Sequence, residues 1–294
     1  MDGGRRGSSR AIAELGSARI AFVALTVVAC GDAFTTAPQG VADAGGVQDA
    51  IAVGDSVAPV DAGKPWCASQ DATHTFCEDF TAGVPDMIST EVITGGGTIS
   101  ADTTDFTSAP QSFLATSPAL TDVGASASAI ASKAFSSAIG SHFSLSLDLK
   151  IDSSCVAKSA KNGVSVLALD FADTNYNLVI QVLPGEIDAF ELSGQTVTQA
   201  HQFQTIVPNG WQRWALDVDG TATLGTSAAP KTINLTVGST TIFKEALQKA
   251  PIVALAHPQL VIGAIVKNAV GESPACKIHV DDILFDVRTL AMPL

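Results

Sequence analysis

Alternation of apolar and polar residues is the dominant pattern of this chain, and it predicts β-strands. In His142–Ile151 every second residue is Phe, Leu or Ile, while the residues between them are Ser, Asp or Lys. Successive side chains of a strand point to opposite faces of a sheet, so this segment would bury one face and expose the other. Further strand-like runs occupy 76–80, 90–94, 111–116, 128–135, 164–172, 176–183, 187–193, 211–218, 231–237, 259–267 and 277–288.

Turn-forming dipeptides separate these runs and favour an antiparallel arrangement. Only 244–250 has the composition of a short helix. Many short strands with one polar face, and almost no helix, are typical of two antiparallel sheets packed face to face. The sequence therefore predicts an all-β fold, a two-sheet antiparallel β-sandwich. The turn signals are Asn162-Gly163, Pro184-Gly185, Asn209-Gly210 and Asp219-Gly220.

The first thirty residues have the layout of an export signal. Four arginines precede an apolar stretch, 20–29, which is too short to span a bilayer of ~30 Å. The stretch ends in Val-Val-Ala-Cys and resembles the bacterial lipoprotein box, in which the cysteine is acylated after cleavage. The resemblance implies cleavage after Ala29 and a lipid on Cys30, which would anchor the chain to one leaflet. The alternative is an ordinary secretory signal in which this cysteine is incidental.

Composition divides the rest of the chain in two. Residues 30–65 are Cys30 and a segment rich in Ala, Gly, Val and Asp, with one aromatic residue and no sustained period. Such a segment has too few large apolar groups to offset the entropy of ordering, so we expect a disordered tether. Residues 66–294 carry the strand pattern and have a length that suits one large β-domain. We expect an exported protein, lipid-anchored to a bacterial membrane and facing the periplasm or the cell surface.

The charge of the chain limits its partners. It has 16 basic and 29 acidic side chains and a formal net charge of −13, and removal of 1–29 would make the balance more acidic. Proteins that bind nucleic acid displace counterions from phosphates with Lys and Arg, and this chain would be repelled instead. We therefore expect no nucleic acid partner. Beyond the bilayer reached through Cys30, the expected partner is a glycan or an extracellular protein.

The other four cysteines form an even set, as expected for disulfides in an exported protein. Cys67 and Cys77 flank the first predicted strand, whereas Cys155 follows one well-formed strand and Cys276 precedes the last. Four cysteines permit three pairings, and these positions favour 67–77 with 155–276. Metal binding is the competing interpretation, but the spacing contains no Cys-x-x-Cys or Cys/His pattern of a zinc site.

Five short segments together resemble the concanavalin A-like lectin/glucanase superfamily, and the laminin-G-like modules in particular. Asn209–Val218 resembles their Gly-Trp strand, and Ile233–Gly238 stands where they have a strand and turn. Leu260–Gly263 and Val280–Ile283 are similar to the two strands that follow. Phe76–Phe80 resembles the Phe-Glu-Asp-Phe opening of related jelly rolls. The resemblance implies a jelly-roll sandwich, a fold that lectins, adhesion modules, hydrolases and structural domains share.

The same resemblance implies a calcium site. In many jelly rolls the first and last strands lie side by side, and carboxylates from both hold a structural calcium ion. Here Glu78 or Asp79 would act together with Asp281 or Asp282. Calcium takes six to eight oxygen ligands, so acidic side chains on adjacent strands suit it. The alternative is that these are solvated acids at turns and edges of an acidic protein.

One stretch resembles a catalytic signature. Gly185-Glu-Ile-Asp-Ala-Phe-Glu191 is similar to the G-E-I-D-x-x-E motif of laminarinase-type endo-β-glucanases. The resemblance implies Glu186 as nucleophile, Glu191 as acid/base and Asp188 as the residue that tunes both. Retaining hydrolysis needs the two carboxyl groups ~5–5.5 Å apart. A regular strand would turn Glu191 away from the other two acids, so only a bulge near 189–190 would allow this chemistry.

Few aromatic platforms are available for a sugar cleft, because the chain has three Trp and one Tyr. Trp211 and Trp214 lie three apart on one predicted strand and thus on opposite faces, so one would be core and the other free to meet a ligand. We therefore expect a non-catalytic ligand-binding module, with carbohydrate as one candidate ligand. The alternatives are an endo-β-glycosidase using Glu186 and Glu191, and a purely structural envelope protein.

Overall fold

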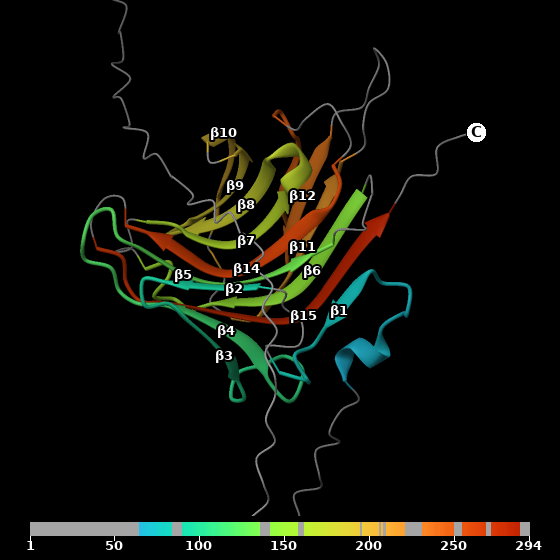
Figure 1. Ribbon diagram of the computed structural model, residues 1–294, viewed down its shortest axis with the longest axis horizontal. Coiled ribbons are helices and arrows are strands. Elements are labelled where there is room, and N and C mark those ends of the chain that lie inside the picture. The colour runs from blue at the N-terminus through green and yellow to red at the C-terminus, as the bar shows by residue number, and fades with distance from the viewer. Residues whose placement is uncertain are drawn as a thin grey trace, which may run out of the picture.

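A computed structural model gives the fold of the β-domain (Figure 1). The leader, Cys30 and the tether fall outside the described residues, so the expectations for export, anchoring and disorder stay predictions. No helix among the described residues has the length and apolarity to cross a membrane. The residues that the structure describes are 65–83, 90–135, 142–157, 162–194, 196–205, 207, 210–220, 231–249, 255–268 and 272–288.

Two antiparallel sheets form a sandwich, as the alternation predicts. In spatial order, the eight-stranded sheet contains β13 (Thr240–Ala246), β12 (Thr232–Val237), β11 (Gln212–Asp219), β6 (His142–Ile151), β15 (Cys276–Arg288), β4 (Ser112–Ser117) and β3 (Thr98–Asp102), and β1 (Phe76–Glu78) also pairs with β15. The seven-stranded sheet contains β10 (Thr196–Gln204), β9 (Glu186–Ser193), β8 (Tyr176–Leu183), β7 (Val164–Phe171), β14 (Pro258–Lys267), β5 (Ser126–Ala134) and β2 (Thr90–Thr94).

The core lies between the inner faces of the two sheets. Strand β6 alternates strictly between buried and half-buried residues, and its Phe and Leu side chains face the core. Phe143 of β6 meets Phe171 of β7 edge to face, with ring centroids 5.2 Å apart, so the contact joins the two sheets. Fully burying a side chain of this size contributes about 1.5–3 kcal/mol. Within the residues that the structure describes, short 3-10 helices are formed by η1 (Trp66–Ser69) and η3 (Ala172–Thr174).

Three strands were not anticipated by the pattern, and one helix was wrongly expected. Strands β3, β10 and β13 each lie at the end of a sheet. Edge strands have fewer neighbours, so their sequences carry more polar residues and weaker alternation. The segment predicted as a helix, 244–250, begins inside β13, because Ile242 and Phe243 pack into the core as a strand. Tertiary packing here overrides local composition.

Both disulfides favoured by the sequence are present. Cys67 pairs with Cys77 and ties η1 to β1, across a separation of 10 residues. Cys155 pairs with Cys276 across 121 residues, where the end of β6 and the start of β15 run side by side. On the loop-entropy model a bridge over such a span stabilises a domain by about 4–5 kcal/mol. The long bridge thus fastens the two central strands of the eight-stranded sheet.

Candidate functional site

The three acids of the predicted catalytic motif lie on strand β9 but do not converge. Pairing with β8 runs through β9 without a register shift from Glu186 to Ser193. Ile187, Ala189 and Glu191 are therefore on the core side, and all three are fully buried. Glu186 and Asp188 are on the outer face of the sheet. The bulge that would bring Glu191 round is absent from this strand, so the hypothesis of an acid triad at 186, 188 and 191 is corrected by the structure.

Glu191 instead anchors a buried network between the edges of the two sheets. Its Oε1 accepts hydrogen bonds from His201 Nε2 at 2.8 Å and the Gln248 amide at 2.9 Å. Its Oε2 accepts from the Tyr176 hydroxyl and the Lys249 amide, both at 2.8 Å. Burial by itself raises the pKa of Glu191, but the donors outweigh it and hold that pKa below its usual range. The carboxylate is thus fully satisfied by the fold.

His201 completes this network with a second carboxylate. Its Nδ1 lies 2.5 Å from Glu245 of β13, while its Nε2 contacts Glu191. The hydrogen bond to Glu191 raises the pKa of His201, burial opposes it, and Glu245 adds to the rise. A protonated imidazole donates from both nitrogens, which matches two carboxylate partners. This arrangement joins β9 and β10 of one sheet to β13 of the other.

A row of six polar side chains, interrupted by Ile265, crosses the outer face of the seven-stranded sheet. From β10 to β2 the strand pairings place one residue of each strand beside the next: Gln202, Asp188, Gln181, Ser165, Ile265, Ser128 and Thr94. Asp188, Gln181 and Ser165 are buried although they face away from the core. The row ends in a hydrogen bond of 2.7 Å between the hydroxyls of Ser128 and Thr94. We refer to these seven residues as the polar row.

Asp188 is the most unusual member of the polar row. Its side chain is only 2% exposed, and Oδ1 has no hydrogen-bond partner among the described residues. Burial raises the pKa of Asp188 to about 7, and the neighbouring carboxyl of Glu186 adds to the rise. The side-chain hydrogen bond from Gln202 acts in the opposite direction. Near neutral pH Asp188 is therefore close to the midpoint of its titration. Its Oδ1 remains a hydrogen-bond acceptor without a donor among the described residues.

An apolar strip runs parallel to the polar row on the same face. It consists of Ala200, Phe190, Val179, Ala168 and Val261, aligned across β10, β9, β8, β7 and β14. A register shift between β7 and β14 lies next to the strip. There Gly263, at φ +129°, lets β14 approach β5 so closely that a Cβ would lie 2.2 Å from the Ala129 carbonyl oxygen. A small hollow over this position is lined by Ser165 of the polar row as well as by the strip.

Trp211 lies on the outer face of the eight-stranded sheet, whereas Trp214 is buried in the core. The prediction that the two side chains lie on opposite faces is confirmed. The Trp211 indole donates to Asp105 at 2.7 Å, and its ring meets that of His279 edge to face. Lys150 also pairs with Asp105. Trp211 and Lys150 thus share Asp105 as their partner on this face.

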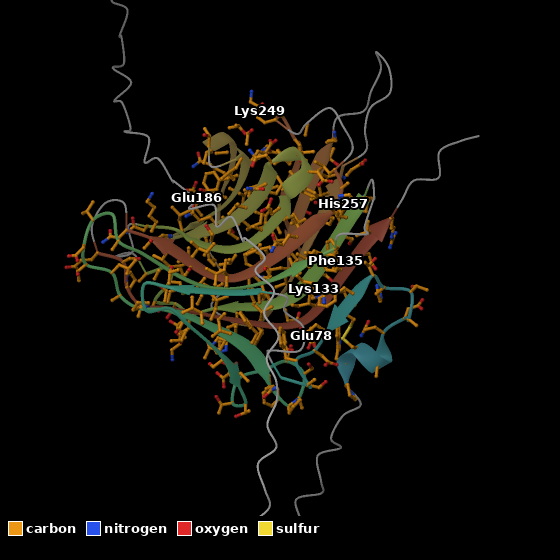
Figure 2. All side chains as sticks on the ribbon, viewed as in Figure 1. Glu78, Lys133, Phe135, Glu186, Lys249 and His257 are labelled. Atoms are coloured by element: carbon orange, nitrogen blue, oxygen red, sulfur yellow. A yellow bond between two sulfur atoms is a disulfide. The ribbon has the colours of Figure 1, made fainter. Side chains whose placement is uncertain are left out.

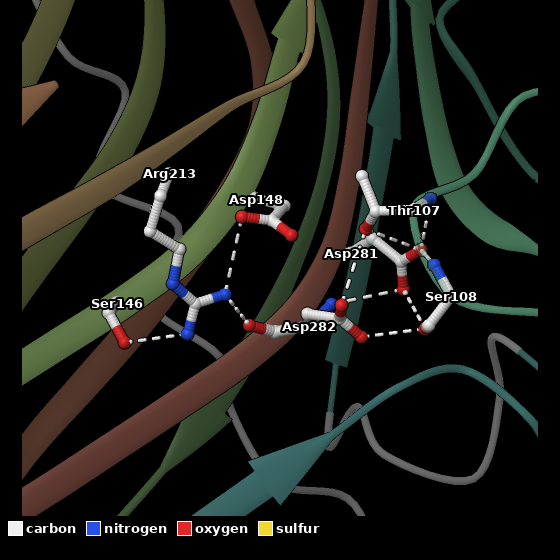
Figure 3. A network of polar contacts seen from close by, with 7 residues as sticks. All are labelled: Thr107, Ser108, Ser146, Asp148, Arg213, Asp281 and Asp282. Carbon is white, nitrogen blue, oxygen red and sulfur yellow. Dashed lines mark hydrogen bonds and ion pairs between the residues drawn. The ribbon is translucent and has the colours of Figure 1, made fainter. Parts of the chain in front are cut away.

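The four candidate calcium ligands lie where the first and last strands meet. Strand β1 pairs with β15, with Glu78 opposite Ile283, as the resemblance implies. A register shift follows Asp281 in β15, and Asp282 has a left-handed φ of +50°. Both aspartates therefore turn toward the segment that contains Thr107 and Ser108 (Figure 3).

The oxygens of these acids are occupied by protein donors. Asp281 Oδ2 accepts the amides of Thr107 and Ser108 at 2.9 Å each, and Asp282 Oδ1 accepts the Ser108 hydroxyl at 2.6 Å. Asp79 accepts an amide from the η1 segment at 2.8 Å. An N–H group cannot act as a calcium ligand, and no three His, Cys, Asp or Glu side chains in the described part of the chain gather at metal-binding distance. These contacts do not fit the expected calcium site.

Burial is the main reason that the pKa values of Glu78, Asp281 and Asp282 are raised. Burial raises the pKa of Glu78 to about 7, the Phe80 amide opposes it, and the charges of Asp79 and Asp281 add to the rise. Burial also raises the pKa of Asp282 to about 6. Glu78 and Glu186 lie well apart on different sheets (Figure 2), so this cluster and the polar row are separate places.

Sequence reasoning did not single out Gln181 or Gln202. One local signal was present, since Gln181 is the polar exception in the inner part of an otherwise apolar strand, Leu-Val-Ile-Gln-Val-Leu. Which residues stand beside it depends on the pairing of β8 with β7 and β9, and strand pairing is not encoded in any one segment. The polar row therefore emerges only from the sheet.

Comparisons with known proteins place the fold more firmly than the sequence does. No family model matches the chain, and no curated protein matches it. Among solved structures, an endo-β-1,4-glucuronan lyase from the fungus Trichoderma reesei is similar with a TM-score of 0.58 and 9% identity, over 73% of this chain and 96% of that one. A cellulose induced protein, Cip1, is similar with a TM-score of 0.50 and 12% identity, over 74% and 100%. At such identities the likeness establishes a shared jelly-roll β-sandwich fold.

Proposed function

We propose that this protein is a lipid-anchored envelope protein whose β-sandwich binds a glycan, without catalysis, on the outer face of the seven-stranded sheet. The observation that carries the proposal is the polar row alongside the apolar strip on one face. Sugars present hydroxyl groups at their edges and C–H groups on their faces. A surface that combines amides and a carboxyl with an apolar floor offers partners to both.

The buried acceptor of Asp188 gives this face its binding potential. A buried oxygen without a donor costs free energy, which a hydroxyl of a ligand would recover. Gln181 and Gln202 pair with Asp188 from either side, and each amide can donate and accept. The name of the similar glucuronan lyase is consistent with a saccharide as ligand for this fold. That support is by analogy of fold alone.

Two features favour a binding role over the endo-β-glycosidase alternative. Glu191, the expected acid/base, faces the core, where its oxygens already accept four hydrogen bonds. The remaining acids, Glu186 and Asp188, interact directly with each other, and a retaining hydrolase needs a sugar between its two carboxyls. The polar row contains no basic residue, so it suits an uncharged glycan better than a polyuronate.

Isothermal titration calorimetry after a glycan-array screen tests the binding proposal. We expect binding to neutral oligosaccharides, and a loss of about tenfold in affinity when Gln181→Ala and Gln202→Ala are combined, because each removes a ligand hydrogen bond. Gln70→Ala, at the residue that follows η1 beside the other sheet, is the matched control and should bind as the unaltered protein does. Array silence across plant, fungal and bacterial polysaccharides would instead favour the purely structural alternative.

Anchoring through Cys30 has its own test. Cells grown with a palmitate analogue should label the unaltered chain but not Cys30→Ala. Equal labelling of the two would contradict the anchor and leave an ordinary secretory signal.

A further inference from the structure

Strands β10 and β13 end their respective sheets, and a charged contact joins them across the edge of the sandwich. His201 and Phe203 of β10 pair with core residues of β9, and Phe243 and Glu245 of β13 pair with core residues of β12. Paired residues of neighbouring strands share a face of the sheet, so all four side chains point between the sheets. Phe203 meets Phe243 edge to face, with ring centroids 6.4 Å apart, and His201 pairs with Glu245 beside this contact. An imidazole and a carboxylate thus stand where apolar side chains would be expected.

The two carboxylates that His201 contacts differ in their access to water. The Glu191 side chain is fully buried, whereas that of Glu245 is 51% exposed. A protonated imidazole donates from both nitrogens, but a neutral one keeps a single N–H and can donate to only one of the two carboxylates. The remaining N–H stays with Glu191, because a buried carboxylate cannot replace a lost donor by water. Loss of the proton therefore breaks the contact between His201 and Glu245.

We propose that His201 is a pH-operated latch, which holds β13 against β10 while its imidazole is protonated and releases β13 when the imidazole is neutral. The inference concerns the edge of the sandwich and does not depend on glycan binding. Hydrogen bonds between charged groups are roughly twice as strong as neutral ones, so the protonated form closes the edge firmly. After release, β13 keeps its pairing with β12 and its aromatic contact with Phe203, while its end near Glu245 is free to open.

The groups around His201 set the pH range of the latch. They are Glu191 of β9, Glu245 of β13 and Tyr176 of β8, and Lys249 approaches Glu191 through its backbone amide. Burial raises the pKa of Glu191, but its donors outweigh burial and hold that pKa below its usual range, while burial raises the pKa of Tyr176. Neither group therefore changes its charge near neutral pH. The hydrogen bond to Glu191 raises the pKa of His201 above its ordinary value of 6.5, burial opposes the rise, and Glu245 adds to it. The latch is closed below pH 6.5 and opens as the pH rises through the higher pKa of the folded protein.

Stability alone does not require an imidazole at this position. Replacing a buried ion pair by apolar residues of similar volume is often neutral or stabilising. Phe203, two residues further along β10, shows that this edge accommodates an apolar side chain. Histidine is distinguished by an ordinary pKa within the physiological range, so its charge responds to the pH of the medium. The position and the chemistry of His201 thus fit a switch better than a permanent brace.

Hydrogen–deuterium exchange of the purified protein, followed by mass spectrometry from about pH 5 to about pH 8.5, tests the latch. Exchange rates are divided by the intrinsic amide rate at each pH, and β6, at the centre of the eight-stranded sheet, serves as the internal reference. We expect the protection of β13 relative to β6 to fall at least about tenfold as the pH rises, the equivalent of one charge-assisted hydrogen bond. An NMR titration of the His201 imidazole should have its midpoint at the same pH.

Two variants separate the latch from a general effect of pH. Glu245→Gln keeps the size of a half-exposed side chain but removes its charge, so β13 should exchange rapidly at every pH. His142→Gln is the matched control, because His142 pairs with Asp217 on the outer face of the eight-stranded sheet, and it should keep the pH dependence of the unaltered protein. An unaltered protein without pH dependence at β13, or the same dependence in Glu245→Gln, would overturn the inference. A loss of protection that β6 shares would overturn it as well, because it reports unfolding of the whole domain.

Discussion

Asp188 and Glu191 are two buried carboxyl groups on one strand, and their environments are opposite. Glu191 faces the core, is fully buried and accepts four hydrogen bonds, two of them from backbone amides. Asp188 faces outward, is 2% exposed and keeps one oxygen without a donor among the described residues. The pKa of Glu191 is lowered by its donors, whereas that of Asp188 is raised by burial and by Glu186.

This difference indicates what each acid contributes. A carboxylate whose lone pairs are all used stabilises the fold and has nothing left for a ligand. A buried carboxyl with one oxygen that lacks a donor and with a raised pKa costs stability, and proteins retain such strain mainly at functional sites. Burial alone does not distinguish the two; the supply of donors does.

Replacing Glu191 should have the largest effect. In Glu191→Gln the new amide N–H₂ faces donors, and His201 loses its buried counter-ion. Breaking a buried ion pair costs about 3–5 kcal/mol of unfolding free energy. Chemical denaturation monitored by tryptophan fluorescence measures it. A change below ~1 kcal/mol, the size of an average substitution, would show that the network is not a structural anchor.

Tyr176→Phe weakens the same network more gently. The hydroxyl that donates to Glu191 at 2.8 Å is lost, while the buried ring remains in the core. A hydrogen bond to a charged group contributes about 1.5–3 kcal/mol, so we expect a loss of about 2 kcal/mol in the same assay. If this variant equals the unaltered protein in stability, the donors to Glu191 are redundant.

The two acids should respond to pH with opposite signs. Glu191 has a lowered folded pKa, so its contribution is present above the unfolded pKa and is lost as the pH falls through the folded value. His201 has a raised folded pKa, so its contribution is lost as the pH rises through that value. Asp188, raised to about 7, destabilises the fold above that pH, and the penalty is relieved as the pH falls toward 4.

Stability curves between pH 4 and 8 test this balance. Each group contributes a slope of at most about 1.4 kcal/mol per pH unit. Asp188→Asn should steepen the loss of stability on acidification, because the compensating gain from Asp188 disappears. An identical pH profile for this variant and the unaltered protein would contradict the raised pKa.

The smallest effect is expected for Asp188→Asn at pH 8. Removing a buried charge without a counter-ion should stabilise the domain by about 1 kcal/mol, the reverse of the loss at Glu191. Asp217→Asn, on the more exposed outer face of the other sheet, should stay within about 0.5 kcal/mol. A large loss of stability in Asp188→Asn would mean that its carboxyl supports the fold after all.

The sequence by itself determined the strands whose two faces differ most. In β6 the alternation was complete, because one face meets the core and the other meets water, and its bounds agree with the structure. The expectation of disulfides in an exported protein, together with the positions of the cysteines relative to the strands, also led to the correct pairing. It includes the bridge from Cys155 to Cys276. The edge strands β3, β10 and β13 gave a weaker signal, since a strand at an edge needs less apolar surface.

Only the tertiary structure decided what the acids of β9 do. Their spacing resembles a catalytic motif, yet the sequence does not reveal whether a bulge is present, and one residue of shift reverses every face. Regular pairing turned Glu191 toward the donors of β8, β10 and the 248–249 segment, and left Asp188 beside Gln181 and Gln202. The polar row joins residues that are distant in sequence, from Thr94 to Ile265. They are neighbours because the hydrogen bonding between strands determines which residues lie side by side.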